Sequence, residues 1–144
     1  MIRFVAVASE GYLEKYGEPQ HPSELVNHYG LFYTNMTDRQ EWQFLDNGKP
    51  LVAVPKHRLN ANNGDFLIKA ALNGLGIIHC PTFLLDEYRR DGRLKTILQD
   101  YQRQATGMYA LFPPGRLIPR RAKAVTDFML QQFGDLPEWD MGLI

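Results

Sequence analysis

The sequence predicts an α/β fold, and two observations predict it. Short apolar segments rich in Val, Ile and Phe alternate with segments of helical periodicity. Residues 58–80 also suggest a strand, a turn, a helix and a second strand, which is the repeating unit of a layered α/β sheet. The length of 144 residues suits one domain, or two small lobes that share a core.

The first half of the chain predicts strands at both ends of a short helical region. Ser9 is placed to cap a helix over residues 10–16, which Gly17 ends. Pro22 suits the first turn of a brief helix that ends at residue 27. The expected strands are residues 2–8, 30–34, 41–45 and 51–54, with a hairpin turn over residues 46–49.

The second half of the chain predicts a larger share of helix than the first half. Residues 58–62 are extended, residues 66–73 form a helix that Gly74 ends, and residues 76–80 return as a strand. Thr82 is placed to cap a helix to residue 90. Two more strands are expected at residues 94–98 and 108–112, followed by a helix over residues 119–133. The last helix has an apolar stripe at spacings of three and four, formed by Val125, Phe128, Met129 and Phe133.

The charge balance argues against direct contact with nucleic acid. Sixteen basic residues balance sixteen acidic residues, whereas phosphate binding usually requires a basic face. The basic cluster of Arg116, Arg120, Arg121 and Lys123 is interpreted as a solvated helix face. No segment approaches the roughly 20 apolar residues of a membrane helix, and the single Cys80 permits no internal disulfide. We therefore expect a soluble, cytoplasmic chain with no membrane partner.

No motif supports catalysis, a cofactor or a metal site. His79 and Cys80 are adjacent on a predicted strand, so their side chains should point to opposite faces. The two serines, Ser9 and Ser23, lie outside any Gly-x-Ser-x-Gly motif. Gly74-x-Gly76 follows a helix and lacks the third glycine of a dinucleotide loop. The sequence predicts that the chain is not an enzyme.

Two polar segments follow predicted strands and are candidates for binding a ligand. Residues 62–65, Asn-Asn-Gly-Asp, combine side-chain amides with the free backbone N–H groups of a helix N-terminus. Ser9 follows the first strand in the same way. Ligands of open α/β sheets gather beyond the carboxyl ends of strands, so the two tips could share one cleft. The alternative is that these residues only cap helices and turn the chain.

The chain resembles a known family in five successive segments. They are VAVASEGYLEKYGEPQHPSEL, EWQFLDNGKP, NANNGDFLIKAALNGLGIIHCPTFLL, DGRLKTIL and YALFPPGRLIPRRAKAVTDFMLQQF. Their order resembles the effector-binding domain of LysR-type transcriptional regulators, from the start of its second lobe to its closing helix. The similarity covers nearly all of residues 2–133.

The resemblance implies a type 2 periplasmic-binding-protein-like fold, with two α/β lobes around a cleft that binds a small-molecule effector. By position it implies effector-binding roles for Ser9, Asn62, Asn63 and Gly64, and weaker roles for Gly76 and Ile77. It also implies hinges near residues 7–8 and 109–111.

The sequence departs from the family pattern at its N-terminal side. The DNA-binding helices, the linker helix and the first part of the first lobe have no counterpart here. We expect one complete lobe over residues 1–107, with residues 108–144 supplying the returning strand, closing helix and tail of the other. The apolar stripe of the closing helix would then lack its usual sheet. Because exposed apolar surface of that size tends to find a partner, we expect a homodimer.

The leading hypothesis is effector sensing within a LysR-type regulator, with DNA contacted only through a helix-turn-helix domain outside this chain. The alternative is a truncated protein-interaction module that dimerises with an intact regulator and binds no ligand. A stand-alone solute-binding protein is a third hypothesis, and an enzyme is the last.

Overall fold

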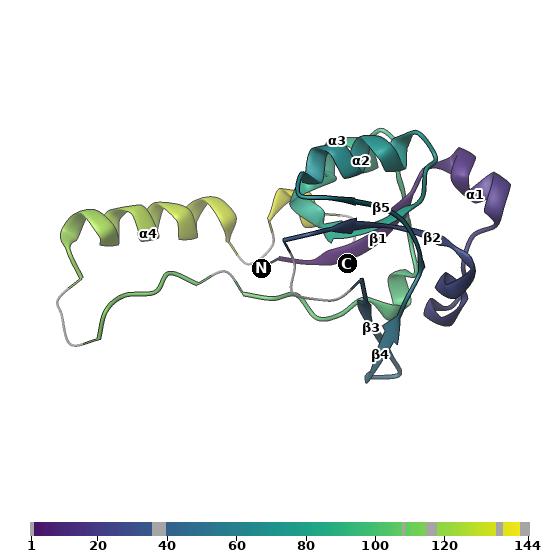
Figure 1. Cartoon of the computed structure of the whole chain (residues 1–144). Helices are drawn as coiled ribbons and strands as arrows, with labels where there is room; N and C mark the ends of the chain where they lie inside the picture. Colours follow the sequence, from purple (N-terminus) through teal and green to yellow (C-terminus); the bar gives the residue numbers. More distant parts are fainter. Residues whose placement is uncertain (1, 36–39, 108, 115–117, 135–136, 142–144) are drawn as a thin grey trace.

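A five-stranded sheet organises most of the chain, in the order β5-β2-β6-β1-β7 (Figure 1). The computed structural model describes residues 2–35, 40–107, 109–114, 118–134 and 137–141. The sheet strands are β1 (Phe4–Ala8), β2 (Tyr29–Tyr33), β5 (Lys56–Ala61), β6 (Ile77–Pro81) and β7 (Lys95–Ile97). The helices are α1 (Glu10–Tyr16), α2 (Gly64–Leu72), α3 (Asp86–Arg90) and α4 (Arg120–Phe133).

The direction of β1 sets the geometry of the sheet. β2 is parallel to both β5 and β6, whereas β1 is antiparallel to β6 on one side and to β7 on the other. Phe4 is paired with Pro81 and Val7 with Ile78. The start of β1 therefore lies beside the carboxyl ends of β2, β5 and β6, and its end lies at the opposite edge.

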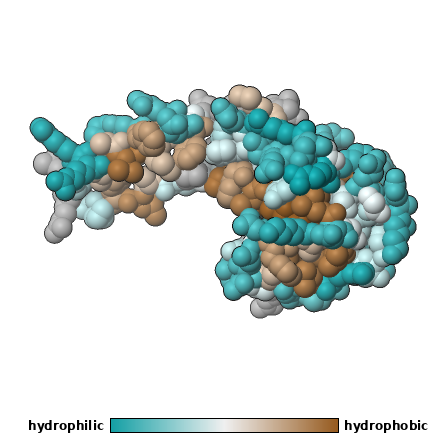
Figure 2. Space-filling view, turned by 90° about the horizontal axis from the view of Figure 1, so that it is seen from above, coloured by the Kyte–Doolittle hydropathy of each residue, from teal (hydrophilic) through white to brown (hydrophobic). Residues whose placement is uncertain are grey.

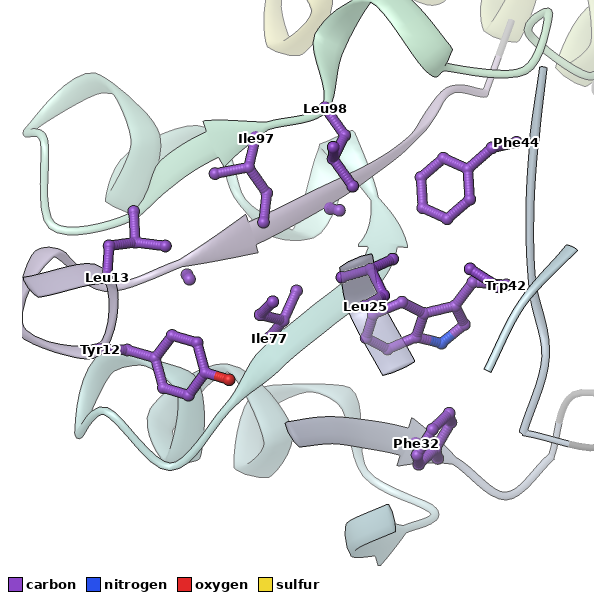
Figure 3. Packing of buried hydrophobic residues seen from close by; sticks show 12 residues of the cluster. Tyr12, Leu13, Leu25, Phe32, Trp42, Phe44, Ile77, Ile97 and Leu98 are labelled. Atoms are coloured by element: carbon purple, nitrogen blue, oxygen red, sulfur yellow. The ribbon is translucent and has the colours of Figure 1, made fainter. Parts of the chain in front are cut away.

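Alternation along the strands divides the buried residues into two clusters. On β1, Val5 and Val7 pack with α2 on one face, while Ala6 and Ala8 belong to the cluster on the other face. That second cluster, drawn in Figure 3, is completed by α1 and by aromatic residues of the β3–β4 hairpin. Cys80 lies in the first cluster and His79 contacts the aromatic rings of the second, which confirms that the two side chains point to opposite faces.

The hairpin turn predicted at residues 46–49 is confirmed. β3 (Trp42–Asp46) and β4 (Lys49–Ala53) are antiparallel and form a separate two-stranded sheet. Asn47 and Gly48 have φ angles of 49° and 77°, and two successive positive φ angles are typical of a tight hairpin turn. Trp42 and Phe44 lie two residues apart on β3 and are both buried, so both aromatic side chains point into the core.

The chain enters and leaves the sheet side by side. The backbone N–H of Ile2 donates to the carbonyl of Thr106 at 2.7 Å, and the N–H of Thr106 donates back to Ile2 at 2.8 Å. This antiparallel bridge is next to the start of β1. Val7 and Ala8, where a hinge was expected, are instead fully buried; Val7 is paired with both β6 and β7, and Ala8 is paired with β7, so that expectation is wrong.

The strand expected at residues 108–112 is wrong for residues 109–112, which form no strand, and Met108 lies outside the described residues. A strand needs a neighbour for its backbone N–H and C=O groups. Tyr109 and Leu111 are 80% and 91% exposed, so no sheet covers this segment.

Two expected helices differ in type or extent. Residues Pro22–Asn27 form a 3₁₀ helix rather than an α-helix. The helix expected over residues 82–90 is divided into a 3₁₀ turn, Thr82–Leu84, and the short α3. Thr82 does not cap a helix, because its hydroxyl donates to the carboxylate of Asp140 instead.

α4 forms as predicted and has no buried residue. It extends from the rest of the chain, beyond the long segment that follows β7 (Figure 1). Its predicted apolar stripe faces solvent, with Val125 and Phe128 at 63% and 58% exposure. Figure 2 shows hydrophobic surface along this helix, separate from that of the sheet.

The C-terminal tail returns to the sheet domain. Asp140 is buried, accepts a hydrogen bond from the Thr82 hydroxyl at 2.6 Å and lies 3.5 Å from Nε of Arg3. Arg89 donates to the backbone carbonyls of Trp139 and Met141. The tail therefore contacts three segments of the sheet domain: the residue before β1, the turn after β6 and helix α3.

Gly76 is required by packing where the chain enters β6. A Cβ atom at this position would lie 2.7 Å from the backbone oxygen of Tyr29 and 3.1 Å from Cδ2 of Leu31. Gly11 in α1 is a useful contrast, since a Cβ there would meet nothing within 4 Å.

Replacing Asp140 should detach the tail. Asp140→Ala removes the short acceptor of the Thr82 hydroxyl, which keeps only the carbonyl of Arg3 at 3.4 Å, and it removes the carboxylate that pairs with Arg3. We therefore expect the free energy of unfolding to fall by about 1–3 kcal/mol. Urea unfolding followed by Trp fluorescence measures it. Glu138→Ala on the exposed side of the same tail is the control and should change the free energy little; an equal loss in both variants would contradict the role of Asp140.

Alanine at two glycine positions should have opposite effects. Gly76→Ala forces backbone atoms apart and should lower the free energy of unfolding by about 1–3 kcal/mol. Gly11→Ala should raise it by about 0.5–1 kcal/mol, because alanine is the better helix former. Thermal unfolding of both variants checks the sign, and a neutral Gly76→Ala would show that the strand entry can relax.

Candidate functional site

Two adjoining pockets lie at the edge of the sheet where β2, β5 and β6 end. Because β1 is antiparallel, its first residue, Phe4, lies at the same edge. The paired Ile2–Thr106 entry and exit of the chain are next to it. Tyr33, the last residue of β2, and His79 of β6 line both pockets, so the two pockets are neighbours at this edge.

The first pocket has a volume of about 300 Å³ and lies between the sheet and the β3–β4 hairpin. It combines an aromatic floor with amide, hydroxyl and charged groups. Its lining consists of Phe4, Leu31, Phe32, Tyr33, Thr34, Gln40, Glu41, Trp42, Gln43, Asn60, His79, Arg103, Gln104 and Thr106.

The second pocket has a volume of about 480 Å³ and lies on the α2 side of the same edge. It is the more apolar of the two and is open to the N-terminus of α2. Its lining consists of Tyr33, Asn62, Asn63, Gly64, Asp65, Leu67, Ile78, His79, Cys80, Pro81, Phe83 and Leu84.

His79, which lines both pockets as Tyr33 does, is packed among aromatic rings. Its ring lies 5.3–5.8 Å from the ring centroids of Phe4, Trp42 and Phe44. Burial, and to a smaller extent the positive charge of Arg103, lowers the pKa of His79 to about 4. The imidazole is therefore neutral near pH 7 and offers one N–H donor and one nitrogen acceptor.

Arg103 supplies the positive charge of the first pocket. Its guanidinium donates to the side-chain oxygen of Gln43 on β3. Glu41 lines the same pocket, but Arg103 forms no ion pair with it among the described residues. Among the described residues the guanidinium forms no other side-chain hydrogen bond, so its remaining N–H groups can donate to a ligand.

Cys80 lines the second pocket but has no thiolate character. It is buried, and burial raises the pKa of its thiol far above the ordinary value. The thiolate is the reactive form of cysteine, so the geometry provides no nucleophile here.

Asn62, Asn63 and Gly64 lie together at the second pocket, as three of the six candidate residues. Asn63 also caps α2, because its side-chain oxygen accepts a hydrogen bond from the N–H of Phe66 at 3.0 Å. The capping interpretation is thus confirmed for Asn63. Asn62 is exposed and Gly64 is half-buried.

Ser9, Gly76 and Ile77 lie at the other edge of the sheet. Ser9 follows the end of β1, and Gly74 rather than Asn63 is its neighbour. Ile77 is fully buried between α1 and the sheet, and Gly76 is held against Tyr29. The expectation that Ser9 and the Asn62–Gly64 turn share one cleft is wrong, because it assumed that the first strand runs parallel to its neighbours.

Sequence analysis missed the residues that form the first pocket. Tyr33 and Asn60 could have been found from their positions at the ends of two predicted strands. His79 was considered only as a partner for Cys80, although its place near the end of a strand was visible. Arg103 follows the last strand of the sheet in an irregular segment, and no pattern in the sequence indicates that it returns to this edge.

The described residues contain no cluster of three His, Cys, Asp or Glu side chains that could hold a metal ion. Within the same residues, no helix combines the length and apolar character needed to cross a membrane. The linings offer aromatic contact, neutral hydrogen-bonding groups, the guanidinium of Arg103 and the carboxylates of Glu41 and Asp65.

A family model described as the LysR substrate binding domain matches residues 2–134. The chain is 30% identical over 135 residues to the HTH-type transcriptional regulator CrgA of Neisseria meningitidis, covering 92% of this chain and 44% of that protein. It is 29% identical over 133 residues to the HTH-type transcriptional regulator PtxR of Pseudomonas aeruginosa, covering 92% and 43%. The chain thus spans about two fifths of the length of these relatives. Their names are those of transcriptional regulators and not of enzymes.

Solved structures agree with this assignment. The regulatory domain of CrgA superposes with a TM-score of 0.69 at 27% identity, covering 92% of this chain and 65% of that one. A regulatory domain of AphB from Vibrio vulnificus gives a TM-score of 0.73 at 26% identity, covering 90% and 64%. The α/β sheet is thus that of a type 2 periplasmic-binding-protein-like regulatory domain, and the chain belongs to the LysR substrate-binding domain family.

Proposed function

We propose that this chain senses a small-molecule effector for a LysR-type regulator of transcription. The observation that carries the proposal is the coincidence of three features at one edge of the sheet. Two adjoining pockets open there, the parallel strands end there, and the chain enters and leaves the lobe there at Ile2 and Thr106. Ligands of open α/β sheets bind at such an edge.

The position of the crossover gives the proposal a mechanism. Ile2 and Thr106 form the pair of backbone connections about which the other lobe, the first of the domain, would move. A ligand that bridges the pockets and the other lobe would favour the closed arrangement over the open one, and so shift an existing equilibrium. In this scheme residues 1–107 are the second lobe, and residues 108–144 belong to the returning part of the first.

The regulator would pass this change to DNA through its helix-turn-helix domain, in the cytoplasm where the DNA lies. This chain would itself make no DNA contact. Of the six candidate residues, Asn62, Asn63 and Gly64 remain proposed ligand contacts because they line the second pocket. Ser9, Gly76 and Ile77 have no place in either pocket, so a ligand role for them would require a second site.

We also propose that two copies of the chain associate through α4. Val125, Phe128, Met129 and Leu130 are between 38% and 68% exposed on this helix. Burial of each large apolar side chain contributes about 1.5–3 kcal/mol, so a self-complementary contact here would be favourable. The alternative function, an interaction module without a ligand, would use the same helix but would leave the pockets unused.

Ligand binding should be detected at one edge of the sheet only. We expect a panel of small polar metabolites, screened by ¹H–¹⁵N NMR on the whole chain, to contain compounds that shift the amides of His79, Asn62 and Thr106 in a saturable manner. The amides of Ser9 and Gly74 should not move, because they lie at the opposite edge. Compounds that shift only Ser9 and Gly74, or a chain that stays silent towards the whole panel, would contradict effector sensing at these pockets.

Self-association should depend on the apolar face of α4. We expect multi-angle light scattering across a dilution series to show a dimer, and Phe128→Glu to convert it to a monomer by placing a charge in the contact. Gln131→Glu adds the same charge on the polar side of the helix and should leave the dimer intact. A monomeric wild-type chain at all concentrations would contradict the proposal.

A further inference from the structure

We propose that the first pocket binds a flat aromatic ring that carries one carboxylate, with the ring on the floor formed by Trp42 and His79 and the carboxylate on Arg103. The inference rests on the proposed function and adds the chemical class of the ligand. Three features of the pocket support it: the aromatic floor, the neutral polar groups and the single guanidinium.

The floor of the pocket favours a flat, unsaturated group. Phe4, Phe32, Trp42 and His79 line it, and neighbouring ring centroids lie 5.4–5.8 Å apart. Aromatic rings gain an additional attraction from one another when they pack edge-to-face or offset at such distances. The volume of about 300 Å³ is at the small end of ligand pockets and suits one ring with a short substituent.

The polar groups at the floor and rim are mostly neutral. His79 has no hydrogen-bond partner among the described residues, although it is packed between aromatic rings. Its low pKa keeps it uncharged near pH 7, so it can accept from or donate to a ring substituent without demanding a counter-ion. Asn60, Gln43 and Gln104 add amides, which also serve either role.

The charges of the pocket favour a single carboxylate over a cation or a polyanion. Arg103 is the one Lys or Arg side chain in the described lining, and Glu41 is the one acidic side chain. Gln43 orients the guanidinium through its side-chain oxygen, which leaves the planar fork that suits a carboxylate. A ligand with several negative charges would have one cation to meet them, and would lie beside Glu41.

NMR titration of the whole chain with three simple probes tests this assignment. Benzoate has the ring and the charge, benzyl alcohol lacks the charge, and cyclohexanecarboxylate lacks the flat ring. We expect benzoate to give saturable shifts at the Trp42 indole N–H and the His79 amide, with an affinity about tenfold or more above that of either other probe. Equal affinities for benzoate and cyclohexanecarboxylate would overturn the role of the aromatic floor.

Variants then test the carboxylate position. Arg103→Gln should weaken benzoate about tenfold or more while leaving benzyl alcohol unchanged. Lys49→Gln removes an equal charge from the hairpin turn, outside the pocket lining, and should leave both affinities unchanged. Equal losses in the two variants would show that benzoate responds only to net charge, and would overturn the proposal.

The outcomes separate this proposal from the function on which it rests. If benzoate causes no shift up to millimolar concentration while other small molecules shift the same amides, the ligand class is wrong and effector sensing stands. If benzoate binds but shifts only residues outside the first pocket, the assignment of the pocket is wrong. Before affinities are compared, the ¹H–¹⁵N spectrum of each variant is compared with that of the wild-type chain to establish that its fold is intact.

Discussion

The antiparallel pairing of β1 with β6 and β7 determines which residues meet at the edge of the sheet that carries both pockets. Three neighbouring strands, β2, β5 and β6, run in one direction and end at one edge. Since β1 runs the other way, its first residues lie at that edge and its last residues lie at the far one. The chain therefore enters the lobe beside the pockets, and the Ile2–Thr106 bridge ties its exit to the same place. The two pockets and the paired entry and exit of the chain are adjacent for this reason.

The two pockets differ in the hydrogen-bond partners that their polar groups have within the chain. In the second pocket the helix N-terminus is capped from within by Asn63, and Cys80 is a buried thiol with a raised pKa. In the first pocket His79 is kept neutral among aromatic rings, and Arg103 is oriented by a single amide. Under the proposed function, the first pocket would supply specific recognition and the second would supply apolar contact. The tail, anchored through Asp140 to Arg3 and Thr82, supports this edge from the α3 side.

The sequence predicted most local elements correctly because their signals are local. The Asn47–Gly48 turn, the Asn63 cap and the stripe of α4 each depend on residues within a few positions of one another. Strand direction is not local, so the opposite placement of Ser9 and Asn63 could not be read from the pattern that follows each strand. The strand expected at residues 109–112 failed for a related reason: alternation indicates a strand only where a neighbouring strand exists. Arg103 and Asp140 reach their partners across long sequence separations, which no spacing indicates.

Paramagnetic relaxation measured from two edge positions tests the antiparallel placement most directly. Because Cys80 is buried, a spin label can be attached selectively to Tyr33→Cys at the pocket edge or to Lys95→Cys at the far edge. The account predicts that the label at position 33 broadens the amides of Phe4, Asn62 and Thr106 more strongly than that of Ser9. The label at position 95 should give the reverse, since Lys95 is paired with Ala8. Strong broadening of Ser9 together with Asn62 from position 33 would contradict the account, because it would place both ends of the predicted cleft at one edge.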